Sequence, residues 1–106
     1  EATSEKKAMG HYLTSRVSGV FGTHTHVQTA DECILGGHTA YITDVGMVGP
    51  EHSCLGVEVE PVINIFRFRM PVRFLEASGK CIICGTITQF DEKSGKSHKM
   101  ERIFIR

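Results

Sequence analysis

The chain has 106 residues, which is enough for one domain with a modest hydrophobic core. Its 12 basic residues balance its 12 acidic ones, which argues against a protein with an extended nucleic-acid surface but is compatible with a small phosphate ester. The sequence contains neither a membrane-length apolar run nor a signal-peptide pattern, so we expect a cytoplasmic protein with no membrane partner.

The first predicted element is a helix that Thr3 or Ser4 caps and that runs to about Arg16. Gly10 is expected to weaken this helix by up to about 1 kcal/mol relative to Ala. The apolar positions follow i, i+4 spacing and predict one buried stripe, formed by Ala8, Met9, Tyr12 and Leu13. Because the first residue is Glu1 rather than Met and already adjoins this helix, we expect the chain to be the tail of a longer protein.

The next run, Val17 to Phe21, is apolar and β-branched and predicts a short buried strand. It leads into a loop that carries His24 and His26. In extended chain these side chains would point to the same side, with about 7 Å between their Cα atoms. Such imidazoles can converge on one metal ion, or each can hold one ion of a pair about 3.5–4 Å apart. Two partly exposed histidines bonded to water or backbone are the competing interpretation.

Several neighbours of the histidines are candidates for supporting roles. Gly22 permits a close backbone approach, and Thr23 and Thr25 can hydrogen-bond the metal ligands. Asp31 has two equally supported interpretations, a carboxylate that bonds a ligand histidine or the loop backbone, and a turn residue before the strand that starts at Cys33.

A two-glycine turn, Gly36-Gly37, predicts a hairpin whose returning strand runs from Thr39 to Thr43. The glycine-rich segment Asp44 to Pro50 is predicted to be a loop that approaches the histidines. Asp44 is either an outer-shell carboxylate of the site or a cap of the loop backbone, and the second role is the more common one. A further loop, 51–56, contains an exposed histidine, His52.

A second helix is predicted to begin near Glu58, with Pro61 in its first turn and Arg67 and Arg69 at its end. Its apolar residues fall at helical spacing and are Val59, Val62, Ile63 and Phe66. The Arg-x-Arg pair is a possible phosphate contact, but cations that complement a helix C-terminus are the stronger interpretation.

The remainder of the chain is predicted to be β-structure. The expected strands are 72–77, 80–90 and 98–105, and the polar loop 91–96 joins the last two into a C-terminal hairpin. Cys81 and Cys84 have CxxC spacing, but residues i and i+3 of a strand face opposite sides, so we expect structural thiols rather than a zinc pair. A zinc site that combines cysteines and histidines is a remaining alternative, although no recognised ligand spacing supports it. Its residues would be Cys33, His38, His52 and Cys54.

The stretch from Gly22 to Asp31 resembles the last metal-binding motif of the calcineurin-like metallophosphoesterases, in which Gly-x-His-x-His closes a two-metal site. The bacterial YmdB-type branch, which resembles a cyclic-nucleotide phosphodiesterase, is the closer match. Three further stretches fit that branch in the same order: 3–10, 39–47 and 70–74.

The resemblance implies an α/β (α+β) fold, part of a calcineurin-like metallophosphoesterase β-sandwich flanked by helices, with a C-terminal β-hairpin. Residues 1–106 would be the C-terminal portion of a single domain. The remaining N-terminal part would supply the other metal ligands and the general acid, so we expect no catalytic residue in this segment. Homo-oligomerisation is a further possibility.

The function implied is hydrolysis of a small phosphodiester, with 2′,3′-cyclic nucleotides as the expected substrates and two divalent ions (iron, manganese or zinc) as cofactors. His24 and His26 would be metal ligands, and the outer-shell candidates are Thr23, Thr25, Asp31 and Asp44. The alternatives are a non-catalytic fragment or association module that lacks a complete metal site, and a phosphomonoesterase or nuclease on the same scaffold.

Overall fold

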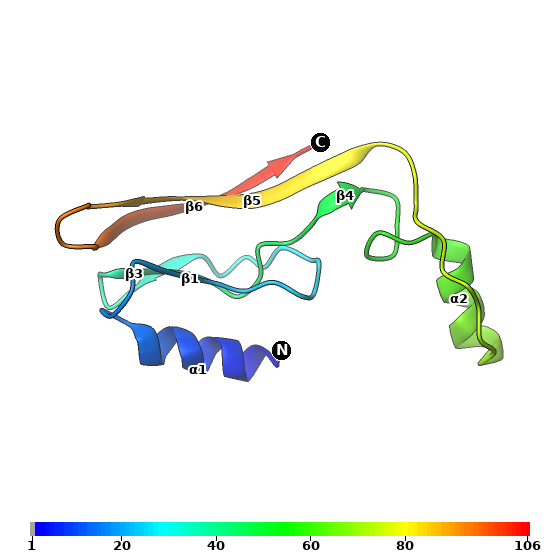
Figure 1. Cartoon of the computed structure of the whole chain (residues 1–106), viewed down its shortest axis with the longest axis horizontal. Helices are drawn as coiled ribbons and strands as arrows, with labels where there is room; N and C mark the ends of the chain where they lie inside the picture. The colour runs from blue at the N-terminus through cyan, green and yellow to red at the C-terminus, as the bar shows by residue number, and fades with distance from the viewer. Residues whose placement is uncertain (1) are drawn as a thin grey trace.

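The computed structural model describes residues 2–106, so Glu1, where the sequence starts, lies outside the described residues. Figure 1 shows a layered body, in which the first helix and two small sheets lie on top of one another, and an arm that projects from one end. The elements in chain order are α1 (Thr3–Leu13), β1 (Gly19–Phe21), β2 (Cys33–Leu35), β3 (Thr39–Ile42), β4 (Val48–Pro50), α2 (Val59–Phe68), β5 (Cys81–Phe90) and β6 (Ser97–Ile105). This composition confirms the predicted mixed α/β class.

The first sheet has the order β1-β3-β2, with β3 parallel to β1 and antiparallel to β2. All four residues of β3 are buried, so this central strand forms the core. The hairpin between β2 and β3 is confirmed. Its turn residues Gly36 and Gly37 have φ values of +55° and +62°, and the His38 N–H donates to Leu35 O at 3.0 Å. Two positive φ values are the signature of the tight turn that a Gly-Gly pair favours.

Helix α1 begins at Thr3 and ends at Leu13, so the predicted cap and the predicted end near Arg16 are both wrong. The carboxylate of Glu5 accepts a hydrogen bond from the Ala2 N–H at 3.2 Å and satisfies a backbone donor at the helix start.

The predicted buried stripe of α1 is also wrong, because Met9 and Tyr12 are 53% and 68% exposed. The buried position is Gly10 instead. A Cβ atom there would lie 2.5 Å from the ring of Tyr41 in β3. The helix therefore packs through its glycine, and the cost of Gly10 in helix propensity is offset by a close approach to the core.

Strand β1 is shorter and less buried than the run Val17 to Phe21 predicted. It starts at Gly19, and Phe21 is 66% exposed. Within residues 2–106 the strand pairs with β3 along one edge, and its other edge has no partner strand. The prediction of a strand is thus confirmed within narrower bounds, and the prediction that it is buried is wrong.

The second sheet has the order β4-β5-β6, and its long β5–β6 hairpin confirms the predicted C-terminal hairpin. The side chain and the N–H of Ser97 donate to Ser18 O at 2.6 Å and to His38 O at 2.7 Å, which ties the start of β6 to the first sheet. Strand β4 lies in a segment that was predicted to be a loop. It pairs antiparallel with β5. Gly and Pro have low β propensity, so the sequence of this segment does not indicate a strand.

The arm consists of α2 and the irregular segment 69–80 (Figure 1). The predicted helix is confirmed, and Arg69 ends it in a left-handed conformation (φ +51°) with its N–H donating to Ile65 O at 2.8 Å. The predicted strand 72–77 is wrong, because only an isolated bridge between Val57 and Glu76 forms there. None of the residues of α2 is buried, so its predicted apolar face stands largely uncovered.

The arm makes the chain extended for its length. The radius of gyration is 17.1 Å, compared with about 13 Å for a compact domain of this size. No helix among the described residues is long and apolar enough to cross a membrane.

Candidate metal-binding loop

The histidine loop leaves β1 at a point where two chain segments touch backbone to backbone. The Gly22 N–H donates to Ile42 O at 3.0 Å, and the Val45 N–H donates to Gly22 O at 3.0 Å. A Cβ atom on Gly22 would lie 1.8 Å from Thr43 O, so only glycine fits. The ends of β1 and β3 therefore lie together, as the carboxyl ends of neighbouring parallel strands do where α/β sheets bind ligands.

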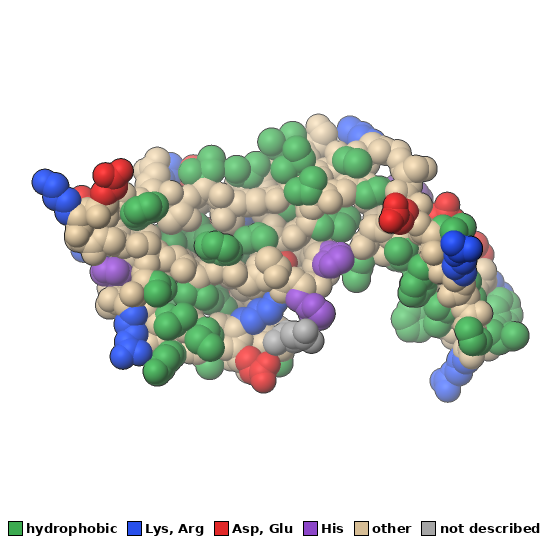
Figure 2. Space-filling model, viewed as in Figure 1, with side chains coloured by type: hydrophobic (Ala, Val, Ile, Leu, Met, Phe, Trp, Pro, Cys, Tyr) green, Lys and Arg blue, Asp and Glu red, His purple; other side chains and the backbone are tan. Residues whose placement is uncertain are grey.

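Both histidines lie in a bent loop and not in extended chain. The φ values of His24 and His26 are +105° and +63°, and both residues are exposed. The expected alternation of an extended strand is thus wrong here, and left-handed bends orient the imidazoles instead. Figure 2 shows histidine side chains at the border of the indentation between the body and the arm.

His26 has the hydrogen bond that a metal ligand uses to fix its tautomer. Its Nδ1 lies 3.1 Å from Leu55 O, and because a carbonyl only accepts, Nδ1 carries the proton. The lone pair of the neutral ring is then on Nε2, free to coordinate. Leu55 has φ +58° and lies in the loop after β4, a partner that the sequence did not indicate.

Asp44 anchors the histidine loop through hydrogen bonds to its carboxylate. Its carboxylate is fully buried and accepts hydrogen bonds from the Thr25 N–H at 2.9 Å, the Thr25 hydroxyl at 2.8 Å and the Gly46 N–H at 2.9 Å. Burial alone would raise the pKa of Asp44, but the hydrogen bonds outweigh it, so the pKa lies below its ordinary value. These contacts are those of the backbone cap that we considered for Asp44.

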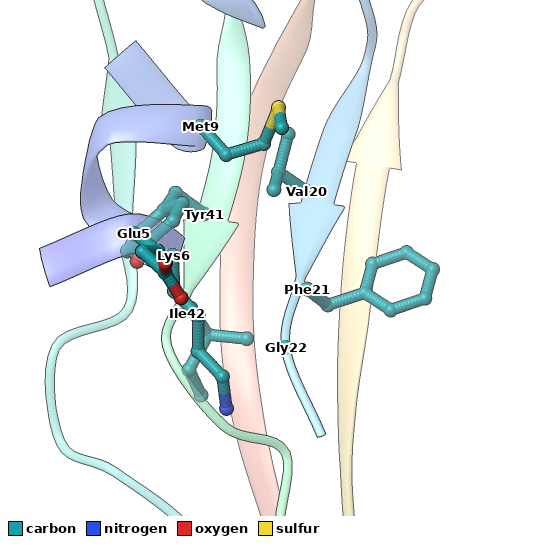
Figure 3. A pocket seen from close by; sticks show the side chains of 8 residues that line it. All are labelled: Glu5, Lys6, Met9, Val20, Phe21, Gly22, Tyr41 and Ile42. Carbon is teal, nitrogen blue, oxygen red and sulfur yellow. The ribbon is translucent and has the colours of Figure 1, made fainter. Parts of the chain in front are cut away.

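Lys6 of α1 is a further anchor, and nothing in the local sequence distinguishes it from other surface lysines. Its ammonium group donates to Thr23 O and lies 3.3 Å from Asp44 Oδ2. Figure 3 shows the Lys6 side chain beside Ile42 and close to Gly22. A cation from the helix thus joins the histidine loop to the buried carboxylate, and the backbone of Thr23 takes part through its carbonyl.

Asp31 forms a separate network behind the loop. Its carboxylate accepts hydrogen bonds from the Thr29 hydroxyl, from the N–H and hydroxyl of Thr43, and from Lys7. Burial would raise the pKa of Asp31, but these donors hold it well below its ordinary value. The Thr29 hydroxyl oxygen also accepts from the Asp44 N–H at 2.9 Å, so both aspartates contact the same threonine.

Gln28 links the histidine loop to the second sheet. Its Nε2 lies within hydrogen-bond distance of Val45 O (3.3 Å), Gly85 O (3.0 Å) and Ile103 O (3.1 Å). The loop is therefore fixed on both sides, by Asp44 and Lys6 toward the first sheet and by Gln28 toward the hairpin. Sequence reasoning missed this role, because both hairpin acceptors are backbone carbonyls distant along the chain.

The donor chemistry of the loop fits a metal ion, whereas the number of donors does not complete a site. Imidazole nitrogen suits zinc, iron and related transition metals, which take about four or more ligands. Among residues 2–106 no group of three or more His, Cys, Asp or Glu side chains is placed to hold a metal ion. The mixed set of Cys33, His38, His52 and Cys54 therefore does not come together as a metal site, and no such group contains Cys81 or Cys84. All four cysteines are free thiols.

Comparison with known proteins identifies the class to which this fold and loop belong. A family model described as YmdB-like protein matches residues 1–103. The chain belongs to the YmdB-like protein family.

Two curated relatives cover almost the whole chain. It is 52% identical over 105 residues to a Bacillus subtilis (strain 168) protein named 2′,3′-cyclic-nucleotide 2′-phosphodiesterase, covering 99% of this chain and 40% of that protein. It is 38% identical over 106 residues to a Mycoplasma pneumoniae protein named putative phosphatase/phosphodiesterase, covering 99% of this chain and 38% of that protein.

Two crystal structures share the fold. A hypothetical protein from Thermus thermophilus aligns with a TM-score of 0.92 at 43% identity, covering 99% of this chain and 41% of that one. A protein described as a novel phosphatase, from Mycoplasma pneumoniae, aligns with a TM-score of 0.94 at 38% identity, covering 99% and 38%. The chain thus spans about two fifths of the length of the relatives it matches.

Proposed function

We propose that the complete protein is a metal-dependent phosphodiesterase that hydrolyses 2′,3′-cyclic nucleotides. The observation that carries the proposal is the hydrogen bond between His26 Nδ1 and Leu55 O, which presents Nε2 for coordination at the edge of the sheet. The named activity of the Bacillus subtilis relative, at 52% identity across this chain, supports the substrate class.

In this proposal His24 and His26 are metal ligands in a two-ion centre of iron, manganese or zinc, whose remaining ligands come from chain beyond residues 1–106. Divalent ions in such a centre make bound water acidic and neutralise charge on the phosphoryl oxygens. The described residues would position the imidazole rings of His24 and His26. Thr25, buried Asp44 and Lys6 fix the loop backbone, and Leu55 O fixes the tautomer of His26.

We also propose that residues 1–106 form one part of a single larger domain. The accessible surface is 7349 Å², compared with about 5,900 Å² for a compact monomer of this mass. The open edge of β1 is one place where more chain would pack, and the exposed ring of Phe21, which borders a pocket beside Thr86 of β5, is a second. In Figure 3 this ring points away from Met9 and Tyr41, so chain that packs on Phe21 would not contact the side of β1 that faces Met9.

A phosphomonoesterase is the second candidate, because the Mycoplasma pneumoniae relatives are described as a phosphatase or phosphodiesterase. A non-catalytic module is the third, and the shortage of donors among residues 2–106 favours it. The substrates separate the first two, since a phosphomonoesterase releases phosphate from a 2′- or 3′-nucleotide but leaves the cyclic diester intact.

The test replaces His24 or His26 by Ala in the complete protein. We expect metal content and hydrolysis of 2′,3′-cyclic AMP to fall together, with activity lower by at least about a hundredfold. His52→Ala, an exposed histidine in the loop after β4, is the matched control and should retain both. Wild-type metal content and activity in either loop variant would overturn the ligand assignment, and a metal-free, inactive wild type would favour the module.

A further inference from the structure

A cavity of about 430 Å³ opens beside His26, on the side of the loop that Gln28 links to the second sheet. It lies between the histidine loop, the loop that contains Leu55, and the face of the β5–β6 hairpin that points toward the first sheet. Its lining residues are His26, Val27, Gln28, Met47, Ser53, Leu55, Ile82, Cys84, Arg102 and Phe104. None of the roles described above requires a hollow of this size.

The wall of the cavity is mainly apolar. Ile82 and Cys84 are alternate residues of β5 and therefore share one face of the strand, and Phe104 of β6 lies directly opposite Cys84. The guanidinium of Arg106 lies 5.1 Å from the centroid of the Phe104 ring. An aromatic ring and aliphatic side chains favour a flat, weakly polar ligand rather than a bare anion.

The polar groups at the cavity are few. The Ser53 hydroxyl donates to Pro50 O at 2.7 Å and accepts from the Gly56 N–H at 3.0 Å. The hydrogen bonds of the Gln28 side chain within residues 2–106 all start from Nε2, so its Oε1 remains an acceptor. Arg102 Nε lies 2.8 Å from Glu32 Oε2, which neutralises the cation at the cavity. One amide acceptor among apolar walls matches the edge of a nucleobase better than a phosphate.

The hydrogen bond that fixes His26 also places the cavity next to the proposed metal site. His26 lines the cavity, and its Nδ1 contacts the carbonyl of Leu55, which lines it as well. A ligand in the cavity is thus adjacent to the ring whose Nε2 is the proposed coordinating atom. A phosphodiester with one bulky substituent needs such an arrangement, in which a cavity for the substituent lies next to the metal ions that bind the phosphate.

We propose that this cavity binds the nucleobase of the substrate and selects nucleoside phosphodiesters over diesters without a base. The inference rests on the proposed phosphodiesterase function and adds the residues that recognise the substrate. A volume of about 430 Å³ falls in the range of about 300–1,000 Å³ typical of small-molecule sites. Phe104 supplies a stacking surface, Ile82 and Leu55 supply shape, and Gln28 Oε1 accepts from the base edge.

The test fills the cavity and compares two substrates in the complete, metal-loaded protein. Ile82→Trp places a large ring in the cavity, whereas Ile83→Trp places the same ring on the opposite face of β5, where Ile83 is 46% exposed. We expect Ile82→Trp to lower kcat/KM for 2′,3′-cyclic AMP at least tenfold more than for glycerol 1,2-cyclic phosphate, a cyclic diester that carries no flat substituent. Ile83→Trp should leave the ratio of the two values unchanged. Equal losses on both substrates, or none, would overturn the proposal.

A binding measurement separates failure of this inference from failure of the proposed function. Adenosine carries the base but no phosphate, so its affinity for metal-free protein, measured by ligand-observed NMR or calorimetry, is independent of catalysis. We expect adenosine to bind the wild type and Ile83→Trp alike and to bind Ile82→Trp at least tenfold more weakly. Binding with this pattern in a protein that hydrolyses neither diester would support the cavity and overturn the phosphodiesterase. Absence of adenosine binding to active wild type would overturn the cavity alone.

Discussion

At the scale of single residues, the candidate site is a loop held by charge. Two carboxylates, Asp31 and Asp44, accept hydrogen bonds from threonines, backbone N–H groups and the lysines of α1. Both groups have pKa values below their ordinary range, because these donors outweigh the opposing effect of burial. Each ionised carboxylate therefore stabilises the folded state.

The sign of the pH dependence follows from the lowered pKa values. The stabilisation is fully present above the unfolded-state pKa of about 3.9 and is lost as the pH falls through the folded-state pKa. We expect the free energy of unfolding of the complete protein to decrease from about pH 5 downward. Asp44→Asn should cost about 2 kcal/mol at pH 7, since its amide N–H₂ replaces one of the two carboxylate oxygens and would face either the donors of Thr25 or the N–H of Gly46. The substitution should also flatten this decrease.

Urea denaturation at pH 7, 5, 4 and 3 measures this effect. Glu92→Gln at the exposed tip of the β5–β6 hairpin is the control and should change neither the value at pH 7 nor the slope. Parallel pH profiles for Asp44→Asn and the wild type would contradict the role given to Asp44.

The residue scale also shows how far sequence reasoning reaches. The loop that carries His24 and His26 was predicted at the end of a strand, because an apolar run followed by glycine is a local signal, and the role of the two histidines as metal ligands stays a prediction. Their orientation was not found, since two positive φ values in a non-glycine loop leave no sequence signature. Lys6 and Leu55 were missed because their contacts with the loop arise only from tertiary packing.

At the scale of elements, the strands and helices with strong local patterns were predicted correctly. The Gly36-Gly37 hairpin, helix α2 and the β5–β6 hairpin are examples. Strand β4 was missed because Gly49 and Pro50 have low β propensity and a non-local partner stabilises them. The segment 72–77 was predicted as a strand by propensity, but no neighbouring strand among residues 2–106 pairs along its length.

The junction between β1 and β3 gives the sharpest prediction at this scale. Gly22→Ala would drive a Cβ atom to within 1.8 Å of Thr43 O, a backbone atom that cannot rotate away. We expect the free energy of unfolding to fall by about 3 kcal/mol, the upper end of typical overpacking costs. The loop should be displaced, so metal content should fall as well.

The matched control is Gly49→Ala in β4, where an added Cβ atom meets nothing within 4 Å. It should change the free energy of unfolding by no more than about 0.5 kcal/mol. Chemical denaturation and metal analysis of both variants provide the comparison. Equal stability of the Gly22 and Gly49 variants would show that the backbone contact at Gly22 is not tight.

At the scale of the whole molecule, a layered body carries a thinly supported arm. Large apolar side chains of the arm are exposed, among them Phe66 (79%), Phe68 (60%) and Met70 (66%). Sequence periodicity predicted the apolar face of α2 correctly but not what covers it, because amphipathicity identifies the face of a helix and not its partner. That residues 1–106 are the C-terminal portion of a single domain stays a prediction, because amphipathicity does not show what lies against this face.

An arginine-specific protease tests the support of the arm in the 106-residue chain. Arg69 and Arg73 lie in or beside the irregular segment, whereas Arg102 lies in β6 and pairs with Glu32. We expect cleavage after Arg69 and Arg73 before cleavage after Arg102, because local opening is easiest where few contacts hold the backbone. Mass spectrometry of a time course identifies the order. Early cleavage after Arg102 would contradict this order.

The contacts of Gln28 Nε2 with carbonyls of the hairpin have a consequence for the order in which the molecule is made. Two of its acceptors, Gly85 and Ile103, lie 57 and 75 residues later in the chain. On the ribosome the histidine loop is therefore synthesised before β5 and β6 and cannot reach its contacts with them until β6 has emerged. The candidate metal-binding loop would thus become rigid late, and in a nascent chain that stalls before β6 it would lack its hydrogen bonds to the hairpin.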